Sequence, residues 1–146
     1  MKKTIKLLFV LAITLASTAF ISSSNQGDWK LHKEVQGIKI FTKVSSCQLE
    51  HTNKSNQYII FKYVNISKKN LRISGRVDAY YNNICRSCNL DSPNEYEFMI
   101  DLKPGKSQEG NCSDEQKAFK LFYSSADSKI APLSKFVFSK LNVSEF

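Results

Sequence analysis

The sequence contains few of the residues on which enzyme active sites depend. Of its 146 residues only two are histidines, His32 and His51, and only five are glycines. A Ser–His or Cys–His nucleophile pair would have to use one of these histidines, and both lie in polar or charged stretches that favour a solvated surface position. Neither a glycine-rich phosphate loop nor a Gly-x-Ser-x-Gly motif is present. We therefore predict no catalytic residues, no metal site and no cofactor.

Long apolar runs are equally scarce, and the only one lies near the N-terminus, at Leu7–Ala16. Three lysines precede this run and small residues follow it, which is the layout of a secretory signal peptide. The run is also shorter than the roughly 20 residues that a membrane-spanning helix needs. We predict a signal peptide over residues 1–24, cleaved after Ala19 or after Ser24. The mature chain, residues 25–146, would then be exported to the periplasm, the cell surface or the medium, with no transmembrane segment.

Charge of one sign is only mildly in excess once the leader is removed. Three of the 21 Lys and Arg residues lie in the leader, so 18 remain against 13 Asp and Glu, a net charge of +5 (18 − 13). The one basic cluster, Lys68–Lys69, has polar neighbours and is interpreted as a turn. We therefore expect no nucleic-acid partner. The remaining 122 residues (146 − 24) are enough for one domain with a modest core.

Four Asn-x-Ser sequences occur, at Asn53, Asn65, Asn111 and Asn142. Such sequences are acceptors for N-glycosylation in eukaryotic secreted proteins. The short lysine-containing leader and the frequent Lys, Asn and Ile are typical of bacterial proteins. We therefore interpret the four matches as coincidence.

Beyond the leader, apolar and polar residues alternate in short segments. The clearest are residues 71–81, LRISGRVDAYY, and residues 95–102, EYEFMIDL. A period of two is typical of a strand with one buried face. The side chains predicted to point inward are Leu71, Ile73, Val77, Ala79, Tyr81, Tyr96, Phe98, Ile100 and Leu102. Further strands are predicted over residues 37–44, 57–66, 117–124 and 135–143.

Turn signals separate these segments at the spacing of hairpins. Residues 67–70 form a four-residue link, and residues 103–106, KPGK, carry Pro and Gly at the second and third positions of a type II turn. No segment after Trp29 shows sustained helical periodicity. About six to eight short strands in one small domain predict an all-β fold, a single antiparallel β-sandwich.

Two segments resemble bacterial immunoglobulin-like sandwiches. In EYEFMIDLKPGKSQEGNC an alternating strand runs into the turn pattern L-x-P-G-x-S, and YIIFKYVNISKKNLRISGRVDAYY is similar to a pair of core strands joined by a polar turn. The resemblance covers residues 57–124. It implies an immunoglobulin-like fold and an exported role in adhesion or recognition, and it carries over no functional residues.

A second resemblance lies at residues 29–43, WKLHKEVQGIKIFTK. This stretch is similar to the opening of START-type lipid-binding domains, which begin with Trp, a charged stretch and a strand of the form G-I-x-I-[YF]-T. It implies a small lipid-binding protein as an alternative. Those domains also need a long C-terminal helix, which this sequence does not offer. On the other interpretation, Trp29 anchors the first strand in the core.

The mature chain has four cysteines, Cys47, Cys85, Cys88 and Cys112. Their even number and the predicted export favour disulfides. The spacing of Cys85 and Cys88 leaves two alternatives open, half of a zinc site or a redox-active dithiol. A zinc site would need a second close pair of ligands, and a redox dithiol is usually followed by a helix. The sequence contains neither.

The expected strand directions bring all four cysteines to one end of the sandwich. Four cysteines allow three pairings. A bond between Cys85 and Cys88 would do little to fasten the fold, so we favour Cys88–Cys112 and Cys47–Cys85.

Tyr80, Tyr81 and Tyr96 lie near the cysteines in the predicted arrangement. Tyrosines at a loop end are one possible binding surface for a carbohydrate or a protein. The sequence therefore predicts an exported, non-catalytic binding or structural module of the cell envelope that recognises a protein or a glycan. The alternatives are a thiol, redox or metal-dependent function at Cys85 and Cys88, or a small lipid-binding protein.

Overall fold

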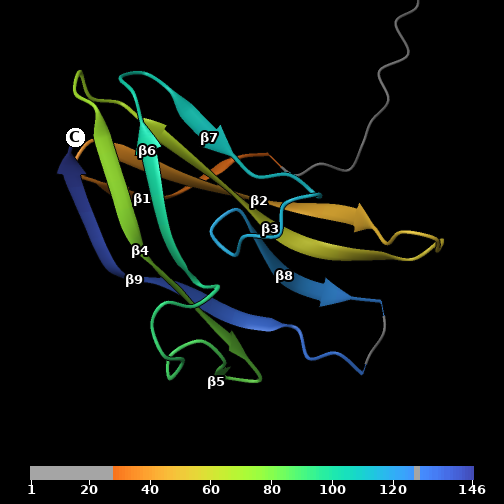
Figure 1. Cartoon of the computed structure of the whole chain (residues 1–146). Helices are drawn as coiled ribbons and strands as arrows, with labels where there is room; N and C mark the ends of the chain where they lie inside the picture. Colours follow the sequence, from red (N-terminus) through yellow and green to blue (C-terminus); the bar gives the residue numbers. More distant parts are fainter. Residues whose placement is uncertain (1–27, 127–128) are drawn as a thin grey trace, which may run out of the picture.

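The chain folds into two antiparallel β-sheets that pack face to face around one core (Figure 1). The computed structural model describes residues 28–126 and 129–146, and the predicted signal peptide, residues 1–24, lies outside them. Among the described residues there is no helix, and so none that is long and apolar enough to cross a membrane. The all-β prediction is confirmed, and the arrangement of the sheets is sandwich-like.

Each sheet is organised around one long central strand. In the first sheet β3 pairs with β2 along one edge, while β7 and β8 pair end to end with its other edge. In the second sheet β4 lies between β9 on one edge and β5 and β6 on the other. The first sheet consists of β1 (Lys30–Val35), β2 (Ile38–Gln48), β3 (Ser55–Asn65), β7 (Ser107–Glu109) and β8 (Lys120–Ser125). The second consists of β4 (Leu71–Tyr81), β5 (Ile84–Cys85), β6 (Glu97–Leu102) and β9 (Leu133–Glu145).

Two-residue turns with positive φ close the β1–β2 and β4–β5 hairpins. Gln36 and Gly37 have φ of 43° and 85°, and Asn82 and Asn83 have φ of 50° and 62°. Positive φ at both positions is typical of a type I′ turn, whose twist matches that of the strands it joins. The predicted turn at residues 103–106 is also present and is closed by a backbone hydrogen bond of 3.1 Å.

All six predicted alternating segments form strands, although most of the ends are shifted. Three strands were not predicted. Strand β1 is charged and exposed up to Glu34, so it has no apolar face that alternation could reveal. Strands β5 and β7 have only two and three residues, which is too short for a period to show.

The core is formed by the inner faces of both sheets. The predicted inward residues of β4 and β6 are confirmed: Leu71, Ile73, Val77, Ala79, Ile100 and Leu102 are buried, and Tyr81, Tyr96 and Phe98 pack against them. Aromatic rings join the sheets, with Phe61 of β3 5.3 Å from Phe138 of β9 between ring centroids. Tyr63 is fully buried beside them, and its hydroxyl donates to the Ala118 carbonyl at 2.8 Å. This burial raises the pKa of Tyr63.

Between β7 and β8 the chain leaves β3 and returns to the same place. Gly110 N donates to Phe61 O at 2.9 Å, and Phe61 N donates to Phe119 O at 3.0 Å, so both ends of the 111–118 segment meet beside one residue of β3. A Cβ atom on Gly110 would lie 2.2 Å from Phe119 O. Glycine is therefore required at this position, where the 111–118 segment leaves the edge of the sheet.

Asn65, the last residue of β3, links the two sheets through its side chain. It is completely buried, and its Nδ2 donates to Lys69 O at 2.7 Å and, across to the second sheet, to Leu102 O at 2.9 Å. Its Oδ1 accepts from both the backbone N and the Oγ of Ser67. The side chain thus shapes the turn into β4 and ties that turn to β6.

Edge strand β1 reaches the second sheet through His32. Its ring stacks on Phe136 with centroids 4.8 Å apart and meets Phe138 edge-on at 5.6 Å. The sequence predicted a solvated histidine. The residue is exposed as a whole, but its ring covers part of the aromatic core. Partial burial, together with the charge of Lys33, lowers the pKa of His32 below its usual value of 6.5.

Replacing Asn65 with alanine removes four hydrogen bonds and leaves Leu102 O without this partner inside the protein. We expect the free energy of unfolding, measured by urea denaturation, to fall by roughly 2–4 kcal/mol. Asn142→Ala, at an exposed position of β9, is the control and should cost less than about 0.5 kcal/mol. Equal losses in the two variants would contradict the role assigned to Asn65.

His32 predicts a pH dependence of stability. Because its pKa is lowered in the folded state, the unfolded chain binds a proton below pH 6.5 that the folded chain does not yet bind. The free energy of unfolding should therefore decrease as the pH falls from about 7.5 to about 5. His32→Phe keeps the ring stack and should reduce this slope, whereas His51→Gln, in the exposed β2–β3 loop, should retain it. The slopes are compared by urea denaturation at both pH values, and an unchanged slope in His32→Phe would refute the prediction.

Candidate functional site

All four cysteines are in disulfides, as predicted, but the favoured pairing is wrong. The bonds are Cys47–Cys112 and Cys85–Cys88, instead of Cys88–Cys112 and Cys47–Cys85. The expected gathering of all four at one end assumed that residues 82–94 form a plain loop. In the structure the Asn82–Asn83 turn sends β5 back along β4, which keeps Cys85 and Cys88 on the second sheet while Cys47 lies in the first.

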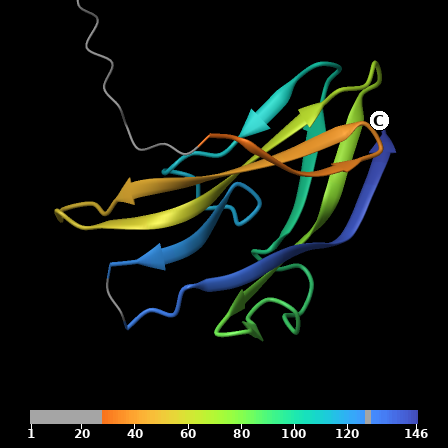
Figure 2. The same cartoon turned by 180° about the vertical axis from the view of Figure 1, so that it is seen from behind.

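The Cys47–Cys112 bond fastens the 111–118 segment to the outer face of the first sheet, the face turned away from the second sheet. Cys47, Ser45 and Ile60 lie on that face by alternation, yet each is at most 5% exposed. Lys120 Nζ also donates to Cys112 O at 2.7 Å. The β2–β3 hairpin projects beyond the second sheet here (Figure 2), so this disulfide supports a part of the fold that the main core does not reach.

The other disulfide closes a short loop, residues 85–88, on the edge of β4. The loop backbone is held independently of the sulfurs: Arg86 N donates to Ala79 O at 2.9 Å, and Ala79 N donates to Ser87 Oγ at 3.0 Å. Ser87 is completely buried, and its hydroxyl donates to Val77 O at 3.2 Å. A bond that joins residues three positions apart adds little to a loop fixed in this way.

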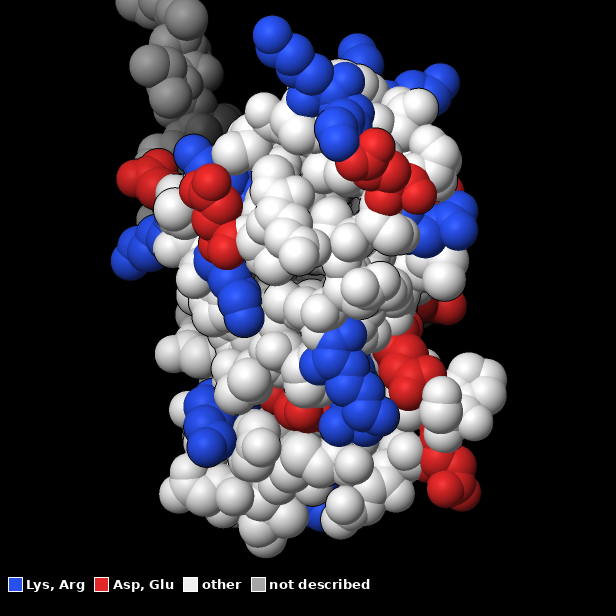
Figure 3. All heavy atoms as spheres, turned by 90° about the vertical axis from the view of Figure 1, so that its left-hand side faces the viewer, with Lys and Arg blue, Asp and Glu red and all other residues white. Residues whose placement is uncertain are grey.

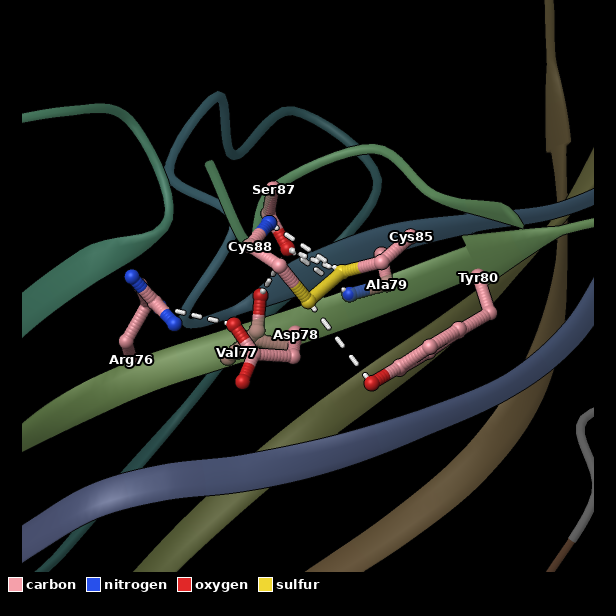
Figure 4. The surroundings of a disulfide bond; sticks show 8 residues. All are labelled: Arg76, Val77, Asp78, Ala79, Tyr80, Cys85, Ser87 and Cys88. Atoms are coloured by element: carbon pink, nitrogen blue, oxygen red, sulfur yellow. Dashed lines mark hydrogen bonds and ion pairs between the residues drawn. A yellow bond between two sulfur atoms is a disulfide. The ribbon is translucent and has the colours of Figure 1, made fainter. Parts of the chain in front are cut away.

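A buried ion pair lies next to this disulfide (Figure 4). Arg76 and Asp78 are on the outer side of β4, where the alternation predicts solvent-exposed side chains. They are nevertheless only 9% and 7% exposed. Arg76 Nε donates to Asp78 Oδ1 at 2.7 Å. The pair was missed from the sequence because nothing in residues 71–81 indicates that the loop carrying Cys88 folds back beside this face.

The sulfurs and the carboxylate form a compact group. A carboxylate oxygen of Asp78 and the Sγ atoms of Cys85 and Cys88 all lie within 4.8 Å of one another, and no other such group of potential metal ligands occurs in residues 28–126 and 129–146. Both sulfurs are bonded to each other, so only the carboxylate is available as a ligand in this state. Cys88 N donates to Cys85 Sγ at 3.1 Å, and the Tyr80 hydroxyl lies 3.6 Å from Cys88 Sγ. This arrangement suits sulfur chemistry better than metal binding.

The three tyrosines proposed as a binding surface do not share one. Tyr81 and Tyr96 pack against the core, and Tyr81 donates its hydroxyl to Phe122 O at 2.9 Å. Their burial raises the pKa of both hydroxyls. Only Tyr80 points to the outer face, where Lys135 Nζ lies 4.4 Å from its ring centroid. Tyr80 therefore belongs to the surroundings of the Cys85–Cys88 bond.

An apolar groove, the first-sheet groove, occupies the part of the outer face of the first sheet that the 111–118 segment leaves open. It has a volume of about 380 Å³ and is lined by Trp29, Lys39, Phe41, Lys62, Val64, Ile66, Gly105 and Ser107. The outer face of an antiparallel sheet is usually polar. The sequence signal was available, because Phe41 lies on the face of its strand opposite to the buried Ile38 and Ile40.

Lysines surround this groove. The Nζ atoms of Lys43 and Lys62 lie 4.4 Å and 5.5 Å from the Trp29 ring centroid. Lys62 also pairs with Glu109 at 3.0 Å, and Lys39 pairs with Glu34 at 3.8 Å. Within these contacts, three lysines and two glutamates leave an excess of one positive charge.

The face seen in Figure 3 has a different character. Basic and acidic side chains are scattered over this face, some next to one another and the others separated by uncharged surface. No continuous basic surface crosses this view. The expectation that no nucleic acid binds remains a prediction.

The two disulfides should contribute unequally to stability. A bond across a separation of 65 residues removes more entropy from the unfolded chain than one across three. We expect the double variant Cys47→Ser/Cys112→Ser to lose roughly 4 kcal/mol of unfolding free energy, and Cys85→Ser/Cys88→Ser about half of that or less. Guanidinium denaturation of both variants measures the difference. A larger loss at residues 85 and 88 would contradict the view that the short loop is held by its backbone.

No protein-family model matches this chain, and neither a curated protein nor a solved structure matches it. The assignments made for the two disulfides and the first-sheet groove therefore rest on the geometry of this chain alone. The resemblance to immunoglobulin-like sandwiches stays a prediction based on residue patterns.

Proposed function

We propose that the chain is an exported, disulfide-stabilised binding module of the cell envelope with an immunoglobulin-like fold. The leader-like N-terminus supports export, and so do two disulfides, which form and persist in oxidising compartments. Two facing antiparallel sheets and the turn at residues 103–106 support the fold assignment. The lining of the first-sheet groove brings no cluster of polar side chains together, so the groove gives no support for catalysis.

The apolar lining of the first-sheet groove is the main support for this proposal. Apolar side chains on the outer face of a sheet remain exposed to water unless another segment or another molecule covers them, and contiguous exposed patches of this kind mark interaction sites. Ile66 is 48% exposed and Phe41 is partly exposed at the groove. The excess lysine charge around the rim favours a partner of negative charge.

We assign the partner as an acidic, partly apolar segment of another exported protein. A glycan site would offer a free aromatic face and several amide or carboxylate side chains for hydroxyl groups. Here lysine ammonium groups lie over Trp29, and the only hydroxyl side chain in the lining is that of Ser107. Apolar side chains flanked by ammonium groups match leucine-like and glutamate-like side chains.

Trp29 makes this proposal testable, because it is the only tryptophan in the chain and lies at the groove. We expect a synthetic peptide of alternating leucine and glutamate to change the Trp29 fluorescence along a saturable curve. Phe41→Ala should weaken this binding by roughly tenfold or more, because a ring at the centre of a contact carries much of its energy.

Met99→Ala is the matched control, since Met99 is 66% exposed on the outer face of the second sheet, away from the groove. It should leave the affinity for the peptide unchanged. A saturable response to a neutral oligosaccharide or to a fatty-acid anion, without one to the peptide, would overturn the choice of partner. No response to any of the three probes would overturn the groove as a binding site.

A further inference from the structure

We propose that Cys85–Cys88 is a redox-active disulfide that undergoes thiol–disulfide exchange with an external dithiol. In this exchange Cys88 Sγ is attacked and Cys85 leaves as the thiolate. The Cys47–Cys112 bond has the structural role. This proposal concerns a different part of the molecule from the first-sheet groove and does not depend on binding there.

The loop at residues 85–88 keeps its shape when the bond opens. Three hydrogen bonds join its backbone and the buried Ser87 hydroxyl to β4, and none of them involves sulfur. The pairing of Cys85 with Tyr80 in the β4–β5 ladder holds the other end. Cys85 and Cys88 are each partly exposed, so an external thiol can approach them. Opening the bond therefore requires no unfolding.

The two sulfurs have unequal surroundings. In exchange, the sulfur that better carries negative charge leaves faster. Cys85 Sγ accepts the backbone N–H of Cys88 at 3.1 Å, and the Ser87 hydroxyl lies 3.8 Å away. Backbone N–H donors stabilise a thiolate, as at helix N-termini. Cys88 Sγ has only the Tyr80 hydroxyl at 3.6 Å, so it is the sulfur assigned to receive the attack.

Asp78 acts on this chemistry through its charge. Its carboxylate lies within 4.8 Å of both sulfurs and is paired with Arg76 away from bulk water. A fixed negative charge at this distance disfavours a second one, so it favours the protonated thiols of the reduced form. The carboxylate therefore slows exchange in both directions, because reduction releases Cys85 as a thiolate and reoxidation begins with an attacking thiolate.

The reaction balances with a dithiol as the reductant. One reagent thiolate attacks Cys88 Sγ, and the electron pair of the broken S–S bond goes to Cys85. The second reagent thiol, as its thiolate, then attacks the reagent sulfur of the mixed disulfide and releases Cys88. The protein gains two electrons and two protons, and the reagent leaves as its disulfide.

The first test uses the whole folded protein and increasing dithiothreitol, with alkylation, intact mass and peptide mapping. We expect two thiols to appear first, at Cys85 and Cys88, while Cys47–Cys112 stays closed and the circular dichroism spectrum is unchanged. Opening of Cys47–Cys112 at the same or lower dithiothreitol would overturn the proposal. So would a loss of folded structure that accompanies opening of the short loop.

The direction of attack is tested with glutathione as a monothiol, by rapid acid quench and alkylation. Peptide mapping should find glutathione on Cys88 and the alkyl group on Cys85 in at least about tenfold excess over the reverse. Equal amounts or the reverse pattern would overturn the assignment of Cys88.

The role of Asp78 is tested in the reduced protein at neutral pH. Asp78→Asn should raise the rate of iodoacetamide alkylation at Cys85 and Cys88 by roughly three- to tenfold, because thiolates become easier to form. Asp101→Asn is the matched control, since it removes the same charge from the exposed Arg72–Asp101 pair on the same sheet. Equal rates in both variants would refute a role for Asp78.

Discussion

The amide of Asn65 is the point on which the arrangement of the two sheets depends. Strands β3 and β4 are the centres of different sheets, and only five residues separate them, so the chain must change sheets within one turn. Asn65 makes this possible by satisfying the backbone of the turn and the Leu102 carbonyl at once, from a position closed to water. Such a group costs free energy if any partner is lost. The Asn-x-Ser match at this residue thus has a structural explanation.

Both candidate sites lie where the outer face of a sheet departs from its usual polar character. On the second sheet, the loop carrying Cys88 lies beside the Arg76–Asp78 ion pair, and both charged side chains are buried. On the first sheet, the 111–118 segment covers one end of the outer face and leaves Phe41 partly exposed at the other. Buried ion pairs seldom add net stability, so the burial of Arg76 and Asp78 is not by itself evidence that the pair stabilises the fold.

Much of the fold could be predicted because apolar and polar residues alternate with a period of two in strands that have one buried face. This is why residues 71–81 were placed correctly to the residue, and why the buried side chains of β4 and β6 were identified. The signal disappears where no face is buried, as in β1, or where a strand is too short, as in β5. The missed β5 had a large effect, because its return along β4 decides where Cys85 lies.

The sequence by itself determined six of the nine strands of the described residues, which side chains of β4 and β6 point inward and that the cysteines are joined in pairs. These properties depend on neighbouring residues, or on counting. Only the tertiary structure decided which cysteines pair, that Arg76 and Asp78 are buried and that Phe41 stays partly exposed. Each of these depends on where a distant loop lies, and loop positions follow from backbone hydrogen bonds, such as Arg86 to Ala79, that carry no signature in side-chain order.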